Sequence, residues 1–135
     1  MVIGVGVDII EVPRVKEALE RARTGRRFRQ RVYTTGEIDY CEGLKRKYES
    51  YAGRFAAKEA VMKSLGVGWG KRAGWLDIEV CSTGSGEPKI KLHQKAGVRA
   101  DQLGIRSFSL SLTHTDHYAI AYVIAEDEGD ASSAS

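Results

Sequence analysis

Residues 48–66 read YESYAGRFAAKEAVMKSLG and carry the most regular pattern in the chain. Apolar residues recur every three or four positions from Ala52 to Ala60, which is the spacing of one face of an α-helix. Gly66 is a typical residue for ending such a helix, so the sequence predicts a long helix over 48–65. Glu59 and Lys63 fall on the same stripe, and they are expected to face inward or toward a cleft.

The N-terminal residues 2–10 alternate, which predicts a β-strand. Apolar residues occupy the odd positions, whereas Gly4, Gly6 and Asp8 share the other face. Glycine weakens a strand and is best explained by the close approach of another backbone or of a ligand. The strand therefore predicts a close neighbour beside a carboxylate.

Two helices are expected around this strand and the long helix. Pro13 suits a first helical turn, and the apolar residues from Val12 to Ala22 keep helical spacing. A second short helix is expected to begin at residues 34–37, with Tyr40 and Cys41 pointing inward.

The later elements are mostly strands. A glycine-rich basic loop, 66–74, contains Lys71 and Arg72 and reads as a surface loop. The expected order after it is a strand with Leu76, Ile78 and Val80 on one face, a turn at 84–86, a strand at 89–93, a short helix at 94–103, and strands at 107–114 and 117–125. This order predicts an α+β domain over 1–125 with a mostly antiparallel sheet packed against the long helix, followed by an acidic, disordered tail at 126–135.

Composition limits the class of protein. The 135 residues suit one domain, and 42% hydrophobic with 29% charged residues is typical of a soluble globular chain. No apolar run approaches the roughly 18 residues of a membrane helix. The N-terminus has no basic segment and carries Asp8 in its apolar stretch, so it does not resemble a signal peptide. A cytoplasmic protein that does not enter the membrane is therefore predicted.

Basic residues concentrate near the N-terminus. Residues 12–31 contain eight basic side chains, among them Arg14 and Arg21, against two acidic ones. This segment is expected to form a basic surface that faces an acidic partner. Nucleic acid, an anionic membrane and an acidic protein all remain open on charge alone.

Two carboxylates could meet where the strand joins the long helix. Asp8 and Glu59 are both expected near the apolar side, and burying two like charges together is costly unless a cation lies between them. Oxygen ligands without cysteine favour Mg²⁺. The alternative is that Asp8 caps the next helix and Glu59 pairs with Lys63.

His114 and His117 are also of a residue type that often binds metal ions. The pair straddles an expected turn and lacks a third ligand, which argues against zinc. A phosphate-binding or proton-handling role for His114, or a purely structural one, fits the pattern better.

Several motifs occur together in one order along nearly the whole chain before the tail. They are Gly4-Val-Gly-Val-Asp8 leading to Arg14, Tyr33-Thr-Thr-Gly-Glu37 with Tyr40-Cys41, Arg54-Phe-Ala-Ala-Lys-Glu59-Ala-Val-Met-Lys63-Ser-Leu-Gly66, Gly86-Glu-Pro88, and Ser109-Leu-Ser-Leu-Thr-His114-Thr before Tyr118-Ala-Ile-Ala. In this combination the chain resembles the holo-[acyl-carrier-protein] synthases, short members of the 4′-phosphopantetheinyl transferase superfamily. Thr113 stands where that family often has serine, and the tail extends past its usual end.

The resemblance implies an Mg²⁺-dependent transfer of 4′-phosphopantetheine from coenzyme A to a serine of acyl carrier protein, in support of fatty acid biosynthesis. It implies that Asp8 and Glu59 hold the metal against the pyrophosphate, with Lys63 neutralising charge. The coenzyme A pocket would be lined by Arg54, Phe55, Pro88 and His114. Arg14, Arg21 and the rest of the basic helix would receive the acidic carrier. A homotrimer with active sites between subunits is also implied.

Two other interpretations remain. Residues 14–31, with Phe28 and Tyr33 nearby, could form a nucleic-acid-binding surface. The carboxylates could instead belong to a purely structural trimer. Within the transferase interpretation, the proton of the attacking serine could go to a water or to Glu59, and the sequence does not choose between them.

Overall fold

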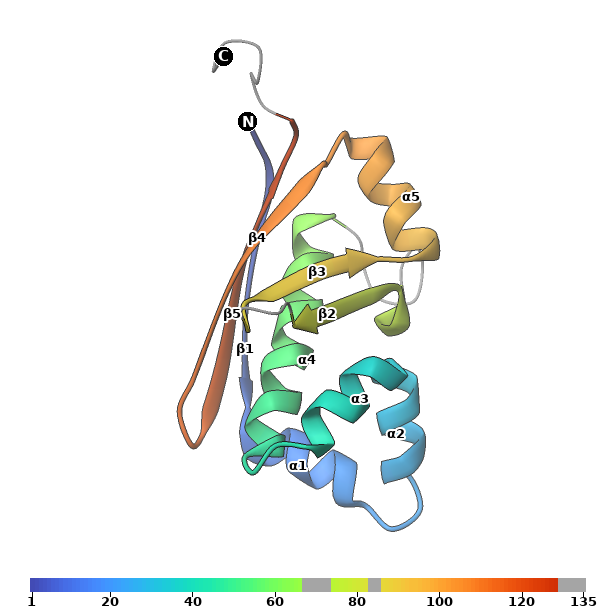
Figure 1. Ribbon diagram of the computed structural model, residues 1–135, viewed down its shortest axis with the longest axis vertical. Coiled ribbons are helices and arrows are strands. Elements are labelled where there is room, and N and C mark those ends of the chain that lie inside the picture. The colour runs from blue at the N-terminus through green and yellow to red at the C-terminus, as the bar shows by residue number, and fades with distance from the viewer. Residues whose placement is uncertain (67–73, 83–85, 129–135) are drawn as a thin grey trace.

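The computed structural model describes residues 1–66, 74–82 and 86–128 (Figure 1). Its elements, in chain order, are β1 (Val2–Glu11), α1 (Val12–Glu20), α2 (Gly25–Val32), α3 (Thr35–Glu42), α4 (Lys47–Ser64), the 3₁₀ turn η1 (Trp75–Asp77), β2 (Ile78–Ser82), β3 (Pro88–Leu92), α5 (Gln94–Leu103), β4 (Ser107–His114) and β5 (Tyr118–Glu126). All strand pairs are antiparallel, so the predicted α+β class is confirmed.

One sheet has three strands in the order β1-β5-β4, and α4 crosses one of its faces. The glycines of β1 make this contact close, because a Cβ at Gly6 would collide with the Ala60 carbonyl of α4 and one at Gly4 with that of Ser64. The close neighbour predicted for this face is thus the helix backbone.

The opposite face of this sheet is exposed and largely apolar. Val5, Val7 and Ile9 of β1 lie on it, with Val7 49% exposed. Tyr122 of β5 pairs with Val7, and its side chain is 46% exposed. A contiguous apolar sheet face of this kind usually marks an interaction surface.

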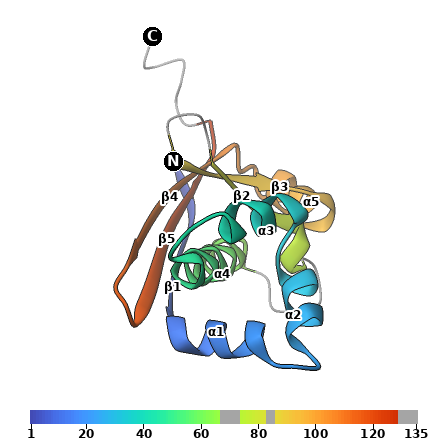
Figure 2. The same ribbon diagram turned by 60° about the horizontal axis from the view of Figure 1, so that its bottom comes forward.

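The main core lies between α4 and the two sheets. Alanines of α4, such as Ala56 and Ala60, pack with Ala121 and Val123 of β5 and with Ile78 of the β2–β3 hairpin. Figure 2 looks nearly along α4 and shows it between the three-stranded sheet and the hairpin. Small residues on the helix let both neighbours approach it closely.

The first three helices cover the start of α4. Val12, Val15 and Leu19 of α1 bury their side chains against Tyr33 and Tyr51. The predicted proline in the first turn of α1 is confirmed. The helix ends at Glu20, however, and a separate helix, α2, follows that the apolar spacing did not predict.

Three local predictions fare differently. The start of α3 is confirmed, because Thr34 and Glu37 form a reciprocal capping box. Cys41 is buried as predicted, but Tyr40 is 41% exposed, so its inward orientation is wrong. Leu76 lies in η1 rather than in a strand, and it is exposed.

Parts of three predictions lie outside the described residues. They concern the basic loop with Lys71 and Arg72, the turn at 84–86, and the tail from residue 129 onward. Among the described helices, none combines the length and the apolar character needed to cross a membrane.

Candidate functional site

The carboxylate of Asp8 forms an ion pair with α4. Asp8 shares a face of β1 with the glycines that contact this helix, and Lys63 Nζ lies 3.1 Å from its Oδ1 atom. The same ammonium donates a hydrogen bond to the Val7 carbonyl at 2.8 Å. The Asp8 side chain is 16% exposed and that of Lys63 is 54% exposed. Asp8 does not cap α1, whose N-cap is Glu11.

Glu59 lies one helical turn before Lys63 on α4 and is partly buried. Within the described ranges, no cluster of three or more His, Cys, Asp or Glu side chains could hold a metal ion. A metal at Asp8 and Glu59 would therefore complete its shell with water or substrate. This donor set suits Mg²⁺, which usually takes one or two carboxylates together with water and phosphate oxygens.

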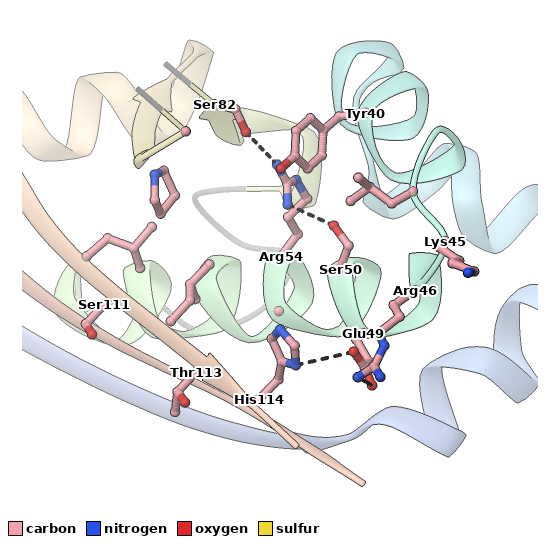
Figure 3. Close-up of a pocket in the computed structure, with 16 residues that line it drawn as sticks. Tyr40, Lys45, Arg46, Glu49, Ser50, Arg54, Ser82, Ser111, Thr113 and His114 are labelled. Atoms are coloured by element: carbon pink, nitrogen blue, oxygen red, sulfur yellow. Dashed lines mark hydrogen bonds and ion pairs between the residues drawn. The ribbon is translucent and has the colours of Figure 1, made fainter. Parts of the chain in front are cut away.

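A pocket of about 600 Å³ opens beside α4 (Figure 3). Its walls come from α3, the α3–α4 connection, α4, the β2–β3 hairpin and β4. Three of the four residues predicted for a coenzyme A pocket line it, namely Arg54, Pro88 and His114. Phe55 is not among its described lining residues, because its ring packs against Trp75 with the centroids 4.7 Å apart.

Arg54 is the most deeply buried charge in the wall of this pocket. Its side chain is 6% exposed and donates hydrogen bonds to Ser50 Oγ at 3.1 Å and to Ser82 Oγ at 3.3 Å. The Tyr40 ring covers the guanidinium. Among the residues that the structure describes, none accepts a hydrogen bond from the buried Nε atom of Arg54. The two serines, from α4 and β2, hold the guanidinium in place.

The pocket also contains two basic residues that were not predicted from the sequence as site residues. Lys45 and Arg46 precede α4 and line the pocket, and Figure 3 shows Arg46 nearer to His114 than Lys45. His114 Nδ1 is 3.4 Å from Glu49 Oε2, and Arg46 is 3.7 Å from the other oxygen of Glu49. The run Lys45-Arg46-Lys47 was the available signal, but only the fold brings it near the end of β4.

A second unpredicted feature supports the site from inside. Lys58 and Glu37 form an ion pair at 2.7 Å, and both side chains are fully buried. Lys58 also donates to the carbonyls of Trp75 and Ile78, while Glu37 accepts from the backbone N–H groups of Thr34 and Val80. Desolvation lowers the pKa of Lys58, and the Glu37 carboxylate opposes that shift. A buried charge pair is tolerated here because its hydrogen-bonding groups are satisfied.

The basic N-terminal surface is formed by α1, the turn after it and α2. Arg14 and Arg21 are exposed on it, and Arg21 pairs with Glu17 at 3.1 Å. Figure 2 shows α1 and α2 side by side at one end of the molecule. This surface is separate from the pocket, since neither arginine lines it.

Known proteins match both the sequence and the fold. The family model described as the 4′-phosphopantetheinyl transferase superfamily matches residues 4–123. A protein of Solibacter usitatus named holo-[acyl-carrier-protein] synthase is 45% identical over 94% of this chain and 100% of its own length. A protein of the same name from Ruminiclostridium cellulolyticum is 48% identical over 88% of both chains.

Solved structures agree. A holo-(acyl-carrier-protein) synthase of Bacillus anthracis in complex with CoA (3′,5′-ADP) superposes with a TM-score of 0.77 at 36% identity, covering 94% of this chain and 98% of its own. The Helicobacter pylori holo-[acyl-carrier-protein] synthase in complex with coenzyme A gives a TM-score of 0.79 at 34% identity, covering 90% and 99%. The resemblance predicted from the sequence is confirmed, and the chain belongs to the 4′-phosphopantetheinyl transferase superfamily.

Proposed function

We propose that this enzyme transfers the 4′-phosphopantetheine group of coenzyme A to a serine of apo acyl carrier protein. The products are the holo carrier protein and adenosine 3′,5′-bisphosphate. The names of the relatives and the ligands of their solved structures support this activity. One observation on this chain carries it: α4 presents a buried arginine to a pocket and, further along, a lysine to the carboxylate of Asp8.

The pocket at Arg54 is the proposed site for the nucleotide part of coenzyme A. Arg54, Lys45, Arg46 and His114 supply donors and positive charge for phosphate, while Pro88 adds an apolar wall. Phe55 packs against Trp75 and is not among the described lining residues of this pocket. A contact between Phe55 and coenzyme A stays a prediction.

Asp8 and Glu59 are the proposed metal ligands. The residues fit Mg²⁺ because both supply carboxylate oxygens, and Lys63 would have to share the Asp8 carboxylate with the metal. When bound, Mg²⁺ would supply charge neutralisation for the pyrophosphate. Lys63 would then offset the charge that develops on the leaving group.

The proposed reaction is a substitution at phosphorus. The carrier serine oxygen bonds to the β-phosphorus of coenzyme A, the bond from this phosphorus to the bridging oxygen breaks, and adenosine 3′,5′-bisphosphate leaves with that oxygen. The serine proton goes to Glu59 or to a water beside Asp8. The chain contributes mainly by positioning the reactants and neutralising charge.

The proposal includes two protein partners, the carrier protein and further copies of this chain. The basic surface of α1 and α2 would receive an acidic carrier protein, with Arg14 and Arg21 as contact residues. The exposed sheet face with Val7 and Tyr122 supports self-association, and a homotrimer with active sites between subunits is proposed. A cytoplasmic location, a role in fatty acid biosynthesis and the absence of nucleic-acid binding stay predictions.

Calorimetric titration with coenzyme A, with and without Mg²⁺, tests the proposal together with a transfer assay on apo carrier protein followed by mass spectrometry. We expect coenzyme A to bind more tightly with Mg²⁺ and the carrier to gain the mass of the phosphopantetheine group. If neither binding nor mass gain occurs, the proposal is wrong. Salt-sensitive RNA binding without coenzyme A binding would favour the nucleic-acid interpretation.

A further inference from the structure

Tyr40 lies over Arg54 at the edge of the pocket. The guanidinium carbon is 4.2 Å from the centroid of the Tyr40 ring, well within the range of a cation–π contact. The two side chains differ in burial, since Arg54 is nearly buried whereas Tyr40 is half exposed. Figure 3 shows the tyrosine reaching from α3 to the arginine on α4.

The remaining contacts of Arg54 define how it is held. A ring stacked on the face of a guanidinium leaves its N–H edge free for hydrogen bonds in one plane. Ser50 and Ser82 accept two of these hydrogen bonds. Cys41, the next residue on α3, contacts Ser50 Oγ with its sulfur at 3.2 Å. Two consecutive residues of α3 therefore act on Arg54, one directly and one through a serine.

We propose that Tyr40 is a positioning residue for phosphate binding, because its ring fixes the plane of the Arg54 guanidinium at the pocket wall. This inference rests on the proposed function, in which a phosphate of coenzyme A occupies that pocket. Without the ring, only the two serine hydrogen bonds hold the guanidinium, and it loses part of its alignment before the ligand arrives. Preorganised donors bind a ligand more tightly than mobile ones, so loss of the Tyr40 ring should lower the affinity for coenzyme A.

Tyr40 should leave the chemical step unchanged. It lines the pocket, whereas Asp8 and Lys63 are not among the described lining residues. Loss of the ring should raise the KM for coenzyme A, while kcat at saturating coenzyme A stays within about twofold. A residue that only stabilised the fold would give no such separation of KM from kcat.

The binding test compares Tyr40→Leu with Tyr40→Phe by calorimetry with coenzyme A. We expect Tyr40→Leu to weaken binding by about 5- to 20-fold and Tyr40→Phe, which keeps the ring, by less than about twofold. Tyr48→Leu is the matched control, because Tyr48 also stacks on cations, those of Lys16 and Lys47, away from the pocket. Tyr40→Met is measured alongside as a second ring-free variant.

A double-mutant cycle with Arg54→Gln decides whether Tyr40 acts through Arg54. We expect removal of the Tyr40 ring to have little further effect on coenzyme A binding once Arg54 is gone. Equal losses in both backgrounds would overturn the inference, as would wild-type affinity in both ring-free variants. If the wild-type protein itself binds no coenzyme A, the proposed function fails; if it binds and the ring-free variants bind equally, only the role of Tyr40 fails.

Discussion

At the scale of single residues, Asp8 is a proposed metal ligand that pairs with a lysine in the folded chain. Lys63 pairs with it, so the half-buried acid has a partner before any ligand arrives. An ion pair with one exposed member contributes only about 0–1 kcal/mol to stability. The pair therefore contributes little to folding, which is compatible with the proposed catalytic role of both side chains.

Replacing Asp8 by asparagine should abolish most transfer without unfolding the protein. We expect the rate to fall by about 10²- to 10³-fold. The free energy of unfolding should change by less than about 1 kcal/mol. Steady-state transfer to apo carrier protein and urea denaturation measure the two quantities. Glu11→Gln, an exposed carboxylate at the end of the same strand, serves as the control and should keep normal turnover. Normal turnover by Asp8→Asn would remove Asp8 from the site.

At the scale of elements, the contact between β1 and α4 sets the position of Asp8. Gly4 and Gly6 bring the strand against the helix backbone, and Asp8 follows on the same face. The sequence predicted this approach from the glycines alone. It did not predict which backbone would fill the space, because a period of two says nothing about the partner.

Gly6→Ala should destabilise the protein strongly. The added methyl group would meet the Ala60 carbonyl, and neither backbone can move without disturbing the sheet. A loss of about 3 kcal/mol in the free energy of unfolding is expected, at the upper end for overpacking. Gly97→Ala is the matched control, since a Cβ there, within helix α5, would meet no atom of the described residues within 4 Å. That variant should gain roughly 0.5–1 kcal/mol. Equal stability of both variants in urea denaturation would contradict the close contact.

The basic surface of α1 and α2 carries a prediction on docking. Arg14→Glu combined with Arg21→Glu should raise the KM for the carrier protein by about tenfold at low salt, because steering charge is reversed. The salt dependence of that KM should also weaken. Lys95→Glu, an exposed reversal on α5, is the control. An unchanged carrier KM in the double variant would count against this surface.

At the scale of the whole molecule, the exposed face of the β1-β5-β4 sheet is an apolar surface on which no other described element packs. Apolar residues of β1 and tyrosines of β5 lie together on it, next to the serines of β4. Such a face favours burial against further copies of the chain. Asp8 lies on the edge strand β1 but faces α4, so the proposed position of the active site between subunits would require a neighbouring copy to reach around the edge of this strand.

Tyr122→Glu should therefore dissociate the oligomer and reduce transfer. Tyr122 is on the central strand, so a charge there would be buried without a partner in any assembly through this face. Light scattering after size-exclusion chromatography gives the mass. Val98→Glu, at a 57% exposed position on α5, should leave the mass unchanged. A monomeric wild-type protein at micromolar concentration would argue against the trimer.

How much of the structure could be predicted from the sequence depended on the kind of signal that each element carries. Periodicity located α4, α5 and the β4–β5 hairpin, because each has a regular apolar face or a clear turn. It failed at α2, where arginines dominate and the helix is held by its neighbours. The pair Lys58–Glu37 was not predicted for another reason: the sequence alone does not show whether a lysine is buried or exposed. Only the contacts of the folded chain identify it.

The buried Lys58–Glu37 pair affects how a ligand would enter the pocket. One ammonium group ties the middle of α4 to η1, β2 and the start of α3, and these elements carry Arg54, Ser82 and Tyr40. The walls that α3, α4 and β2 contribute to the pocket are thus held together at a common point. In the proposed function, a nucleotide that enters the pocket would meet these three walls already arranged, and binding would not have to wait for them to close around it.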